Sequence, residues 1–198
     1  MSLERCAYRF RMEPTSAQRV ALEFMAGARR FVYNWALERR RTYYQEHGQG
    51  ISKKQLSAEL TALKNQPDTT WLKDADSQAL QQALRDLDGA FEAFFAKRAH
   101  YPRFRSRKRD TPTFRVPQRV KLVDGSVYVP KVGWVRIRQS RATDGIIKGA
   151  TFKRSAAGKW FVTLTTEFEM PDVPLPSPDP ALVVGVDAGL VSPITTDD

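Results

Sequence analysis

Apolar residues recur at every second position near the start of the chain, and this predicts a β-strand. A period of two over residues 4–12 is typical of a strand with one buried face. The apolar face carries Cys6, Tyr8, Phe10 and Met12, and the opposite face carries Arg5, Arg9 and Arg11. We therefore expect a half-buried strand with a basic outer face, ending before Pro14.

Helical spacing begins directly after this strand. Thr15 followed by Gln18 forms a capping box, which predicts the start of a helix. Apolar residues then keep helical spacing as far as Ala36, and Gly27 interrupts them, so two helices are expected over residues 15–46. A third, short helix follows Leu56, Leu60 and Leu63, and a fourth, capped by Asp76, follows Leu80, Leu84, Leu87, Phe91 and Phe94.

The second half of the chain changes to short segments separated by turn residues. Asp124-Gly125 joins two of these segments, and residues 155–158 join two more, as in β-hairpins. Another strand is expected over residues 134–138. Several short strands with such turns predict a small antiparallel barrel. Because the first strand is expected to join this barrel, the helices become an insertion, and the predicted fold class is α+β.

Positive charge is concentrated in one segment. The chain carries 32 Lys and Arg against 22 Asp and Glu, a net charge of +10, and residues 97–170 hold 18 of the basic residues with five acids. Such a concentration indicates a polyanionic partner, because neutralising phosphates releases counterions. A membrane surface is the alternative, but the basic segment has the pattern of strands and not of a basic amphipathic helix.

Composition excludes several other classes of protein. The single cysteine, Cys6, allows neither an internal disulfide nor a cysteine-rich zinc site, and His47 and His100 add no zinc-ligand spacing. No stretch approaches the roughly 18 consecutive apolar residues of a membrane span. The first ten residues lack the apolar segment of a secretory signal, so a cytoplasmic protein is expected.

The basic loop at residues 97–109 is a strong candidate for nucleic-acid contact. Seven of its thirteen residues are Lys or Arg, and two aromatic residues stand among them. Aromatic side chains stack on unpaired bases while arginines hold phosphates, which favours RNA. A solvated run of charge is the alternative. With basic strand residues added, the predicted RNA contacts are Arg9, Arg11, Tyr101, Arg103, Phe104, Arg105, Arg107, Lys108, Arg136 and Arg138.

Asp187 is the residue that indicates catalysis most directly. It stands in the run Val-Val-Gly-Val-Asp-Ala-Gly-Leu. A carboxylate buried in such a strand costs several kcal/mol unless it is paired or bound to a metal ion. RNase H-like nucleases place such an acid on their first strand to hold Mg²⁺. Other α/β folds also have an aspartate after a Val/Gly run, so the pattern alone leaves both interpretations open.

Seven stretches follow one another in the order found in a known family. They are residues 8–14, 28–35, 56–64, 76–84, 101–104, 130–134 and 185–189. Through them the chain resembles the TnpB family, transposon-encoded RNA-guided DNA endonucleases related to the type V CRISPR effectors. The resemblance implies a guide RNA and a target DNA with a short flanking motif as partners, and Asp187 as a catalytic acid that binds Mg²⁺.

The resemblance also implies a domain order. A wedge barrel would comprise residues 1–14 and 110–170, a helical recognition domain 15–109, a proline-rich linker 171–181, and the start of a RuvC-like nuclease domain 182–198. The helix that begins near Asp76 corresponds to the segment facing the flanking motif, and glutamine amides can pair with adenine. The implied DNA contacts are Lys53, Ser57, Ser77, Gln78 and Gln81.

One feature of the family is matched only in part. Its nuclease uses three acids to hold two Mg²⁺ ions, and Asp187 is the only one matched here. The family's cysteine zinc site has no counterpart either. We therefore expect this chain to be inactive alone and to need a polypeptide that supplies the rest of the RuvC-like domain. Two other functions stay open: a truncated, non-catalytic RNA-guided regulator or accessory subunit, and a helix-turn-helix DNA-binding protein whose residues 15–46 enter the major groove.

Overall fold

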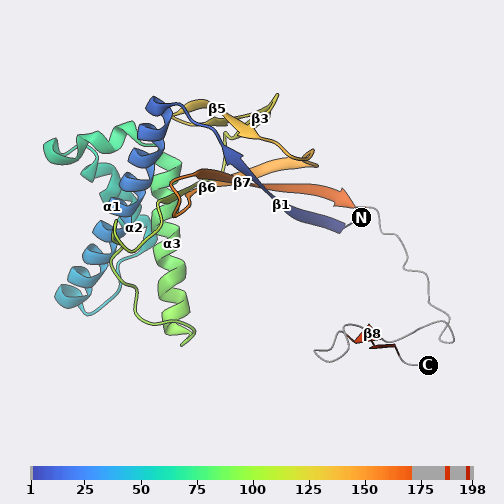
Figure 1. Cartoon of the computed structure of the whole chain (residues 1–198). Helices are drawn as coiled ribbons and strands as arrows, with labels where there is room; N and C mark the ends of the chain where they lie inside the picture. Colours follow the sequence, from blue (N-terminus) through green and yellow to red (C-terminus); the bar gives the residue numbers. More distant parts are fainter. Residues whose placement is uncertain (1, 171–185, 188–194, 197–198) are drawn as a thin grey trace. The chain divides into compact units, whose positions relative to one another are not determined.

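The computed structural model describes residues 2–170, 186–187 and 195–196 (Figure 1). The chain divides into two units, and Leu3–Phe168 is the larger. Its helices are α1 (Ser16–His47), α2 (Lys53–Leu63), the 3₁₀ helix η1 (Pro67–Asp74) and α3 (Ser77–Phe95). Its strands are β1 (Ser2–Met12), β2 (Thr113–Val116), β3 (Lys121–Val123), β4 (Ser126–Val129), β5 (Gly133–Arg138), β6 (Ile146–Arg154) and β7 (Trp160–Met170). The predicted α+β class is confirmed.

Helix α1 begins as the sequence predicts but does not break. The side chain of Thr15 accepts a hydrogen bond from the backbone of Gln18, and the Gln18 side chain accepts one from the backbone of Thr15, so the capping box is confirmed. The predicted break at Gly27 is wrong. Glycine inside a helix costs only about 1 kcal/mol, and buried residues on both sides of Gly27 keep one continuous apolar stripe. The helix ends at Gly48, whose left-handed backbone donates to the carbonyl of Tyr44.

The other predicted helices are confirmed, and one short helix was missed. Asp76 caps α3 by accepting a hydrogen bond from the backbone of Ala79 at 3.0 Å. The missed helix is η1, which buries only Leu72 and therefore has no apolar period to recognise. Its Trp71 ring makes edge-on contacts with the rings of Phe24 and Phe31 on α1, at centroid distances of 5.9 and 5.2 Å.

The strands form one sheet with the order β2-β6-β7-β1-β5-β4-β3. Strand β1 lies between β7 and β5, so the expectation that the helices interrupt the sheet is confirmed. Both predicted hairpins, β3–β4 and β6–β7, pair antiparallel, and the second has a shift of register between Ile147 and Gly149. Strand β2 was missed. Among the described strands, β2 and β3 are the two edges of an open order, so hydrogen bonding does not close the sheet into the predicted barrel.

The inner face of the sheet and the helices share one hydrophobic core. Alternate residues of the strands are buried, among them Phe10, Val135 and Val162. Phe114 stacks on Phe152 at a centroid distance of 4.8 Å, and β2, the strand that carries Phe114, contacts both α1 and α3. Figure 1 shows the helices gathered at one end of the strands. The opposite, outer face of the sheet carries the exposed side chains of the strands, among them Lys121, Arg136 and Lys153.

Beyond Met170 the structure describes only the strands β8 (Val186–Asp187) and β9 (Thr195–Thr196), which pair antiparallel. The predicted proline-rich linker lies outside the described residues. Among the helices that the structure describes, none is both long and apolar enough to cross a membrane.

Candidate nucleic-acid interface

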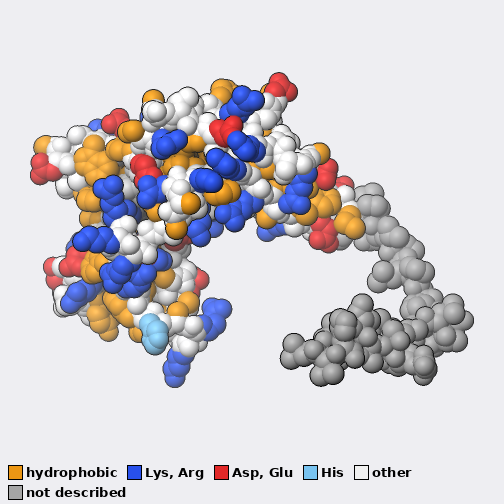
Figure 2. Space-filling view, in the orientation of Figure 1, with side chains coloured by type: hydrophobic (Ala, Val, Ile, Leu, Met, Phe, Trp, Pro, Cys, Tyr) orange, Lys and Arg blue, Asp and Glu red, His pale blue; other side chains and the backbone are white. Residues whose placement is uncertain are grey.

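The outer face of the sheet brings basic residues from five strands together. Arg11 pairs across strands with Arg138, and Ser126 with Arg136, so these side chains lie on the same face. Figure 2 shows Lys and Arg side chains gathered over the strands. The basic residues of this outer face are Arg5, Arg9, Arg11, Arg115, Lys121, Arg136, Arg138 and Lys153. The predicted RNA contacts Arg9, Arg11, Arg136 and Arg138 are therefore neighbours in space.

Few acids neutralise this outer face. Arg5 binds Glu167 at 3.0 Å, Arg115 binds Asp86 at 2.8 Å, and Arg138 binds Glu13. The remaining five cations make no ion pair with another described residue, and Arg9 instead stacks on the ring of Phe161 at 4.3 Å. A surface with more cations than counter-charges attracts a polyanion, so the unpaired cations are the useful ones for binding.

An aromatic pair lies beside these cations. The rings of Tyr128 and Trp134, opposite each other on β4 and β5, are 5.5 Å apart, and Trp134 is 47% exposed. An exposed indole next to Arg136 is suited to stacking on an unpaired base. Neither Tyr128 nor Trp134 is among the predicted RNA contacts. The alternation of residues within this hairpin could have identified them, because it places both rings on the same face of the sheet as Arg136 and Arg138.

The basic loop is ordered by one acid. The Asp110 carboxylate accepts hydrogen bonds from the backbone of Ser106 at 2.6 Å and from the guanidinium groups of Arg105 and Arg103 at 3.1 and 3.0 Å. Burial raises the pKa of Asp110, but the Ser106 amide and the two arginines outweigh it and lower the pKa to about 2. Asn34 on α1 holds the loop through two hydrogen bonds with the backbone of Arg105.

These contacts divide the predicted loop residues into two groups. Arg105 is half-buried, stacks on Tyr33 at 5.0 Å and binds Asp110, so it positions the loop. Arg107 and Lys108 are exposed, and no ion pair joins either to another described residue. Arg103 is exposed but bound to Asp110. Arg107 and Lys108 are thus better placed for a ligand than Arg105.

Aromatic residues of the same loop pack at the far end of the helices. Tyr101 makes edge-on contacts with Phe91 and Phe94 at centroid distances of 5.5 and 5.3 Å, yet it is 49% exposed. It helps to line an apolar cavity of about 410 Å³ with residues of α1 and α3, including Phe95. Phe104 is also exposed. Both predicted aromatic contacts therefore reach the surface.

The predicted DNA contacts form two small polar groups. Gln81 on α3 donates a hydrogen bond to the Ser57 hydroxyl on α2 at 2.9 Å, which joins the two helices. Nearer the start of α3, Gln78 donates to Gln118 at 3.1 Å, and Ser77 is exposed. Lys53 is exposed at the start of α2 and lines a cavity of about 590 Å³ with Arg40 and Arg85. All five residues are half-buried or exposed, and Gln81 and Gln78 each use part of their amide internally.

Asp187 lies on β8, where its backbone pairs with Thr195. The position of its side chain lies outside what the structure describes. No group of three or more His, Cys, Asp or Glu in the described part of the chain could hold a metal ion. The described residues therefore do not supply the ligand set of a two-metal nuclease, and the role of Asp187 stays a prediction.

Comparisons with known proteins relate the chain to one domain family and to three individual proteins. A family described as a helix-turn-helix domain matches residues 1–49. The "Putative RNA-guided DNA endonuclease InsQ" of Escherichia coli (strain K12) is 39% identical over 194 residues, which is 97% of this chain and 47% of that protein. The "Putative RNA-guided DNA endonuclease" of Streptomyces pristinaespiralis is 38% identical over 197 residues, 96% of this chain and 47% of that protein. The chain belongs to the TnpB family.

The match covers only part of each endonuclease relative. This member of the TnpB family spans about half the length of the two endonuclease relatives. A third relative, the "Virulence protein VsdF" of Salmonella dublin, is 35% identical over 101 residues, 46% of this chain and 85% of that protein. The helix-turn-helix description also differs from the geometry: residues 2–49 contain one strand and one unbroken helix, so no turn separates two helices there.

Proposed function

We propose that residues 2–170 form the nucleic-acid-binding part of an RNA-guided DNA endonuclease. The observation that carries this proposal is the outer face of the sheet, with eight basic residues and few acids to neutralise them. In this proposal a guide RNA lies along that face and along the basic loop. Wedge and recognition domains, as named for the TnpB family, would correspond to the sheet and to the helical insertion.

Exposed aromatic residues favour structured RNA over duplex DNA. Trp134, Tyr101 and Phe104 are each exposed by more than two fifths and stand beside Arg or Lys. Duplex DNA keeps its bases stacked and offers such rings little, whereas loops and single strands of RNA offer unpaired bases. The same cations would bind the phosphates of RNA or of DNA, so the preference for RNA over duplex DNA would come from the aromatic residues.

Reading of the DNA motif beside the target is assigned to the polar groups of α2 and α3. Gln81, Ser57 and Lys53 form one part, and Gln78 and Ser77 the other. The Gln81 amide, which already donates one hydrogen bond, keeps a second N–H and an acceptor, and a bidentate contact to adenine needs one of each. The acceptor oxygen of Gln78 is buried, so Gln81 is the better placed of the two. Phosphate contacts set the register of the DNA, and these amides would read its sequence.

Cleavage belongs to the proposal only for the whole protein. Asp187 would be one carboxylate of a Mg²⁺ site of RuvC-like type. The described residues contain no group of three or more His, Cys, Asp or Glu that could hold such an ion, so we assign no catalytic step. In the whole protein, loaded with guide RNA, Asp187→Ala should abolish cleavage of matched DNA and leave target binding unchanged.

The test of the proposed function is a binding titration. The chain is mixed with a structured RNA and, separately, with a duplex DNA of equal length, at salt concentrations from 50 to 200 mM. If six to ten phosphates are contacted, affinity for RNA should fall roughly 10³- to 10⁵-fold over this range. Equal affinity for RNA and duplex DNA, or an affinity that does not change with salt, would contradict the proposal.

A further inference from the structure

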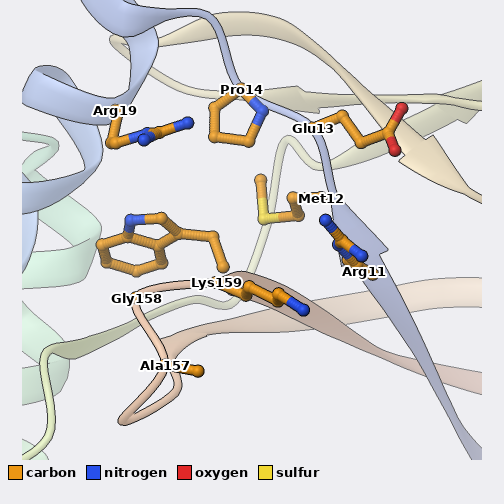
Figure 3. Close-up of a pocket in the computed structure, with 9 residues that line it drawn as sticks. Arg11, Met12, Glu13, Pro14, Arg19, Ala157, Gly158 and Lys159 are labelled. Atoms are coloured by element: carbon orange, nitrogen blue, oxygen red, sulfur yellow. The ribbon is translucent and has the colours of Figure 1, made fainter.

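A cavity of about 370 Å³ lies where three segments of the larger unit meet. Figure 3 shows Arg19 reaching into it from the first turn of α1, Arg11 from the end of β1, and Lys159 from the turn before β7. Met12 and Trp160 form part of its apolar wall. Residues far apart in the sequence thus place three cations around one hollow.

Among the described residues, no acid forms an ion pair with Arg11, Arg19 or Lys159 of this cavity. Glu13 is the only acid among the lining residues, and Arg138 binds its carboxylate. This hydrogen bond, with the nearby charges of Arg136 and Arg11, holds the pKa of Glu13 below its ordinary range. In Figure 3 the Glu13 carboxylate points away from Arg19. Three like charges around a hollow repel one another unless an anion enters it.

Two donors at the cavity also lack acceptors. The indole Nε1 of Trp160 is buried and makes no hydrogen bond, and the same holds for Nε of Arg11 among the described residues. Buried donors without a partner are uncommon and call for an explanation such as a missing ligand. Helix α1 adds to the positive potential, because its first turn contains no acid to offset the helix dipole.

We propose that this cavity binds one phosphate group of the RNA that the sheet carries. A phosphate presents several acceptor oxygens to two guanidinium groups and an ammonium, which is the pairing that Arg and Lys favour. The cavity, at about 370 Å³, also leaves room for the sugar next to the phosphate. Arg11 also belongs to the outer face of the sheet, where it pairs with Arg138, so an RNA strand on that face reaches the cavity directly. This inference rests on the proposed function for the source of the phosphate.

The first experiment compares Lys159→Ala and Arg19→Ala with the control Lys73→Ala. All three side chains are exposed, so each variant should fold, which a thermal melt checks. Binding of a single-stranded RNA is measured by fluorescence anisotropy over a salt series. Loss of one phosphate contact should weaken binding roughly 5- to 8-fold at 0.1 M salt and lower the slope of log K against log salt by about 0.7 to 0.9. Lys73→Ala should change neither.

The second experiment locates the phosphate. A set of RNAs carries one uncharged methylphosphonate linkage each, at successive positions. Wild type should lose affinity most at one linkage, and at that linkage Lys159→Ala should lose nothing further. If every linkage weakens both proteins alike, or if Lys159→Ala and Arg19→Ala bind as Lys73→Ala does, the phosphate cavity is wrong while salt-dependent RNA binding, and with it the proposed function, still stands.

A third arm separates RNA from free phosphate as the source. Inorganic phosphate is added to wild type and to Lys159→Ala, with chloride of equal ionic strength as the control. Inorganic phosphate could raise the midpoint of thermal unfolding of wild type but not of Lys159→Ala, while no single linkage stands out in the methylphosphonate series. That pair of results would overturn RNA as the source of the phosphate. No effect of phosphate together with one special linkage supports a site that needs the RNA strand.

Discussion

Arginines of the helices and cations of the sheet differ in their partners. On the helices, Arg29 binds Asp86 at 2.6 Å, and Arg40 binds Asp88, so α1 is joined to α3 by ion pairs. On the outer face of the sheet, Lys121, Arg136 and Lys153 have no acid partner among the described residues. The same kinds of residue therefore hold helices together in one region and face solvent without a counter-charge in the other.

This difference separates structural charge from binding charge. An ion pair that is mostly shielded from water stabilises packing, and removal of one partner leaves the other uncompensated. An exposed unpaired cation adds little to stability, but it can neutralise a phosphate. A count of charges along the chain therefore does not show which region binds nucleic acid. The ion-paired arginines of the helices contribute less to such binding than the unpaired cations of the sheet. Four predictions test this separation.

The largest effect is expected on the sheet. Replacing Lys121, Arg136 and Lys153 together by Ala should lower the salt slope of RNA binding by two to three and weaken binding roughly 100- to 500-fold at 0.1 M salt. Thermal stability should stay within about 0.5 kcal/mol of wild type, because the three side chains are exposed. Anisotropy titrations and a thermal melt measure both. A change in stability with unchanged RNA affinity would reverse the assignment of the two regions.

A smaller effect is expected on the helices, where a substitution should lower stability and not RNA affinity. Arg40→Ala removes the ion pair with Asp88 and the stacking of the guanidinium on Phe91, whose ring centroid is 4.9 Å away. The free energy of unfolding should fall by about 2 kcal/mol, because the pair is less than one fifth exposed. This corresponds to a melting temperature lower by roughly 4–8 °C. Arg136→Ala is the matched control and should melt as wild type does.

Neutral polar residues are expected to act on DNA sequence alone. Gln81→Ala should reduce discrimination between a matched and a scrambled flanking motif by about 1–3 kcal/mol and leave RNA affinity unchanged. The control is Gln45→Ala, an exposed glutamine of α1. Competition binding with the two DNAs gives the ratio. A ratio that Gln81→Ala leaves unchanged removes Gln81 from the DNA site.

The smallest effect concerns the ordering of the basic loop. The pKa of Asp110 is lowered from 3.8 to about 2, so its charged form stabilises the fold fully above pH 3.8, and this contribution is lost as the pH falls toward 2. Asp110→Asn should therefore be less stable than wild type at neutral pH, by about 1 kcal/mol. Urea unfolding of both proteins between about pH 5 and pH 2 should show this difference shrinking with acid. A difference that is constant with pH would show that the carboxylate charge is not the cause.

Some features could be predicted from sequence because their causes lie within a few residues. The capping box at Thr15 and the cap at Asp76 depend on hydrogen bonds three residues long, and both are observed. The hairpin at Asp124-Gly125 follows from local turn preferences. Alternation in β1 and β5 determined which side chains face solvent. The error at Gly27 has the opposite origin, since packing along the whole of α1 outweighs a local preference.

What the sequence determined by itself is the kind of each main element, the basic character of the second half, and family membership through short ordered stretches. Only the tertiary structure decided which cations are neutralised: Arg40 finds Asp88, Arg138 finds Glu13, and Lys153 finds no described acid. It also decided that Arg11, Arg19 and Lys159 line one cavity. The physical reason is that an ion pair depends on distance in space, which packing of remote segments sets, and a count of charges along the chain contains no such distance.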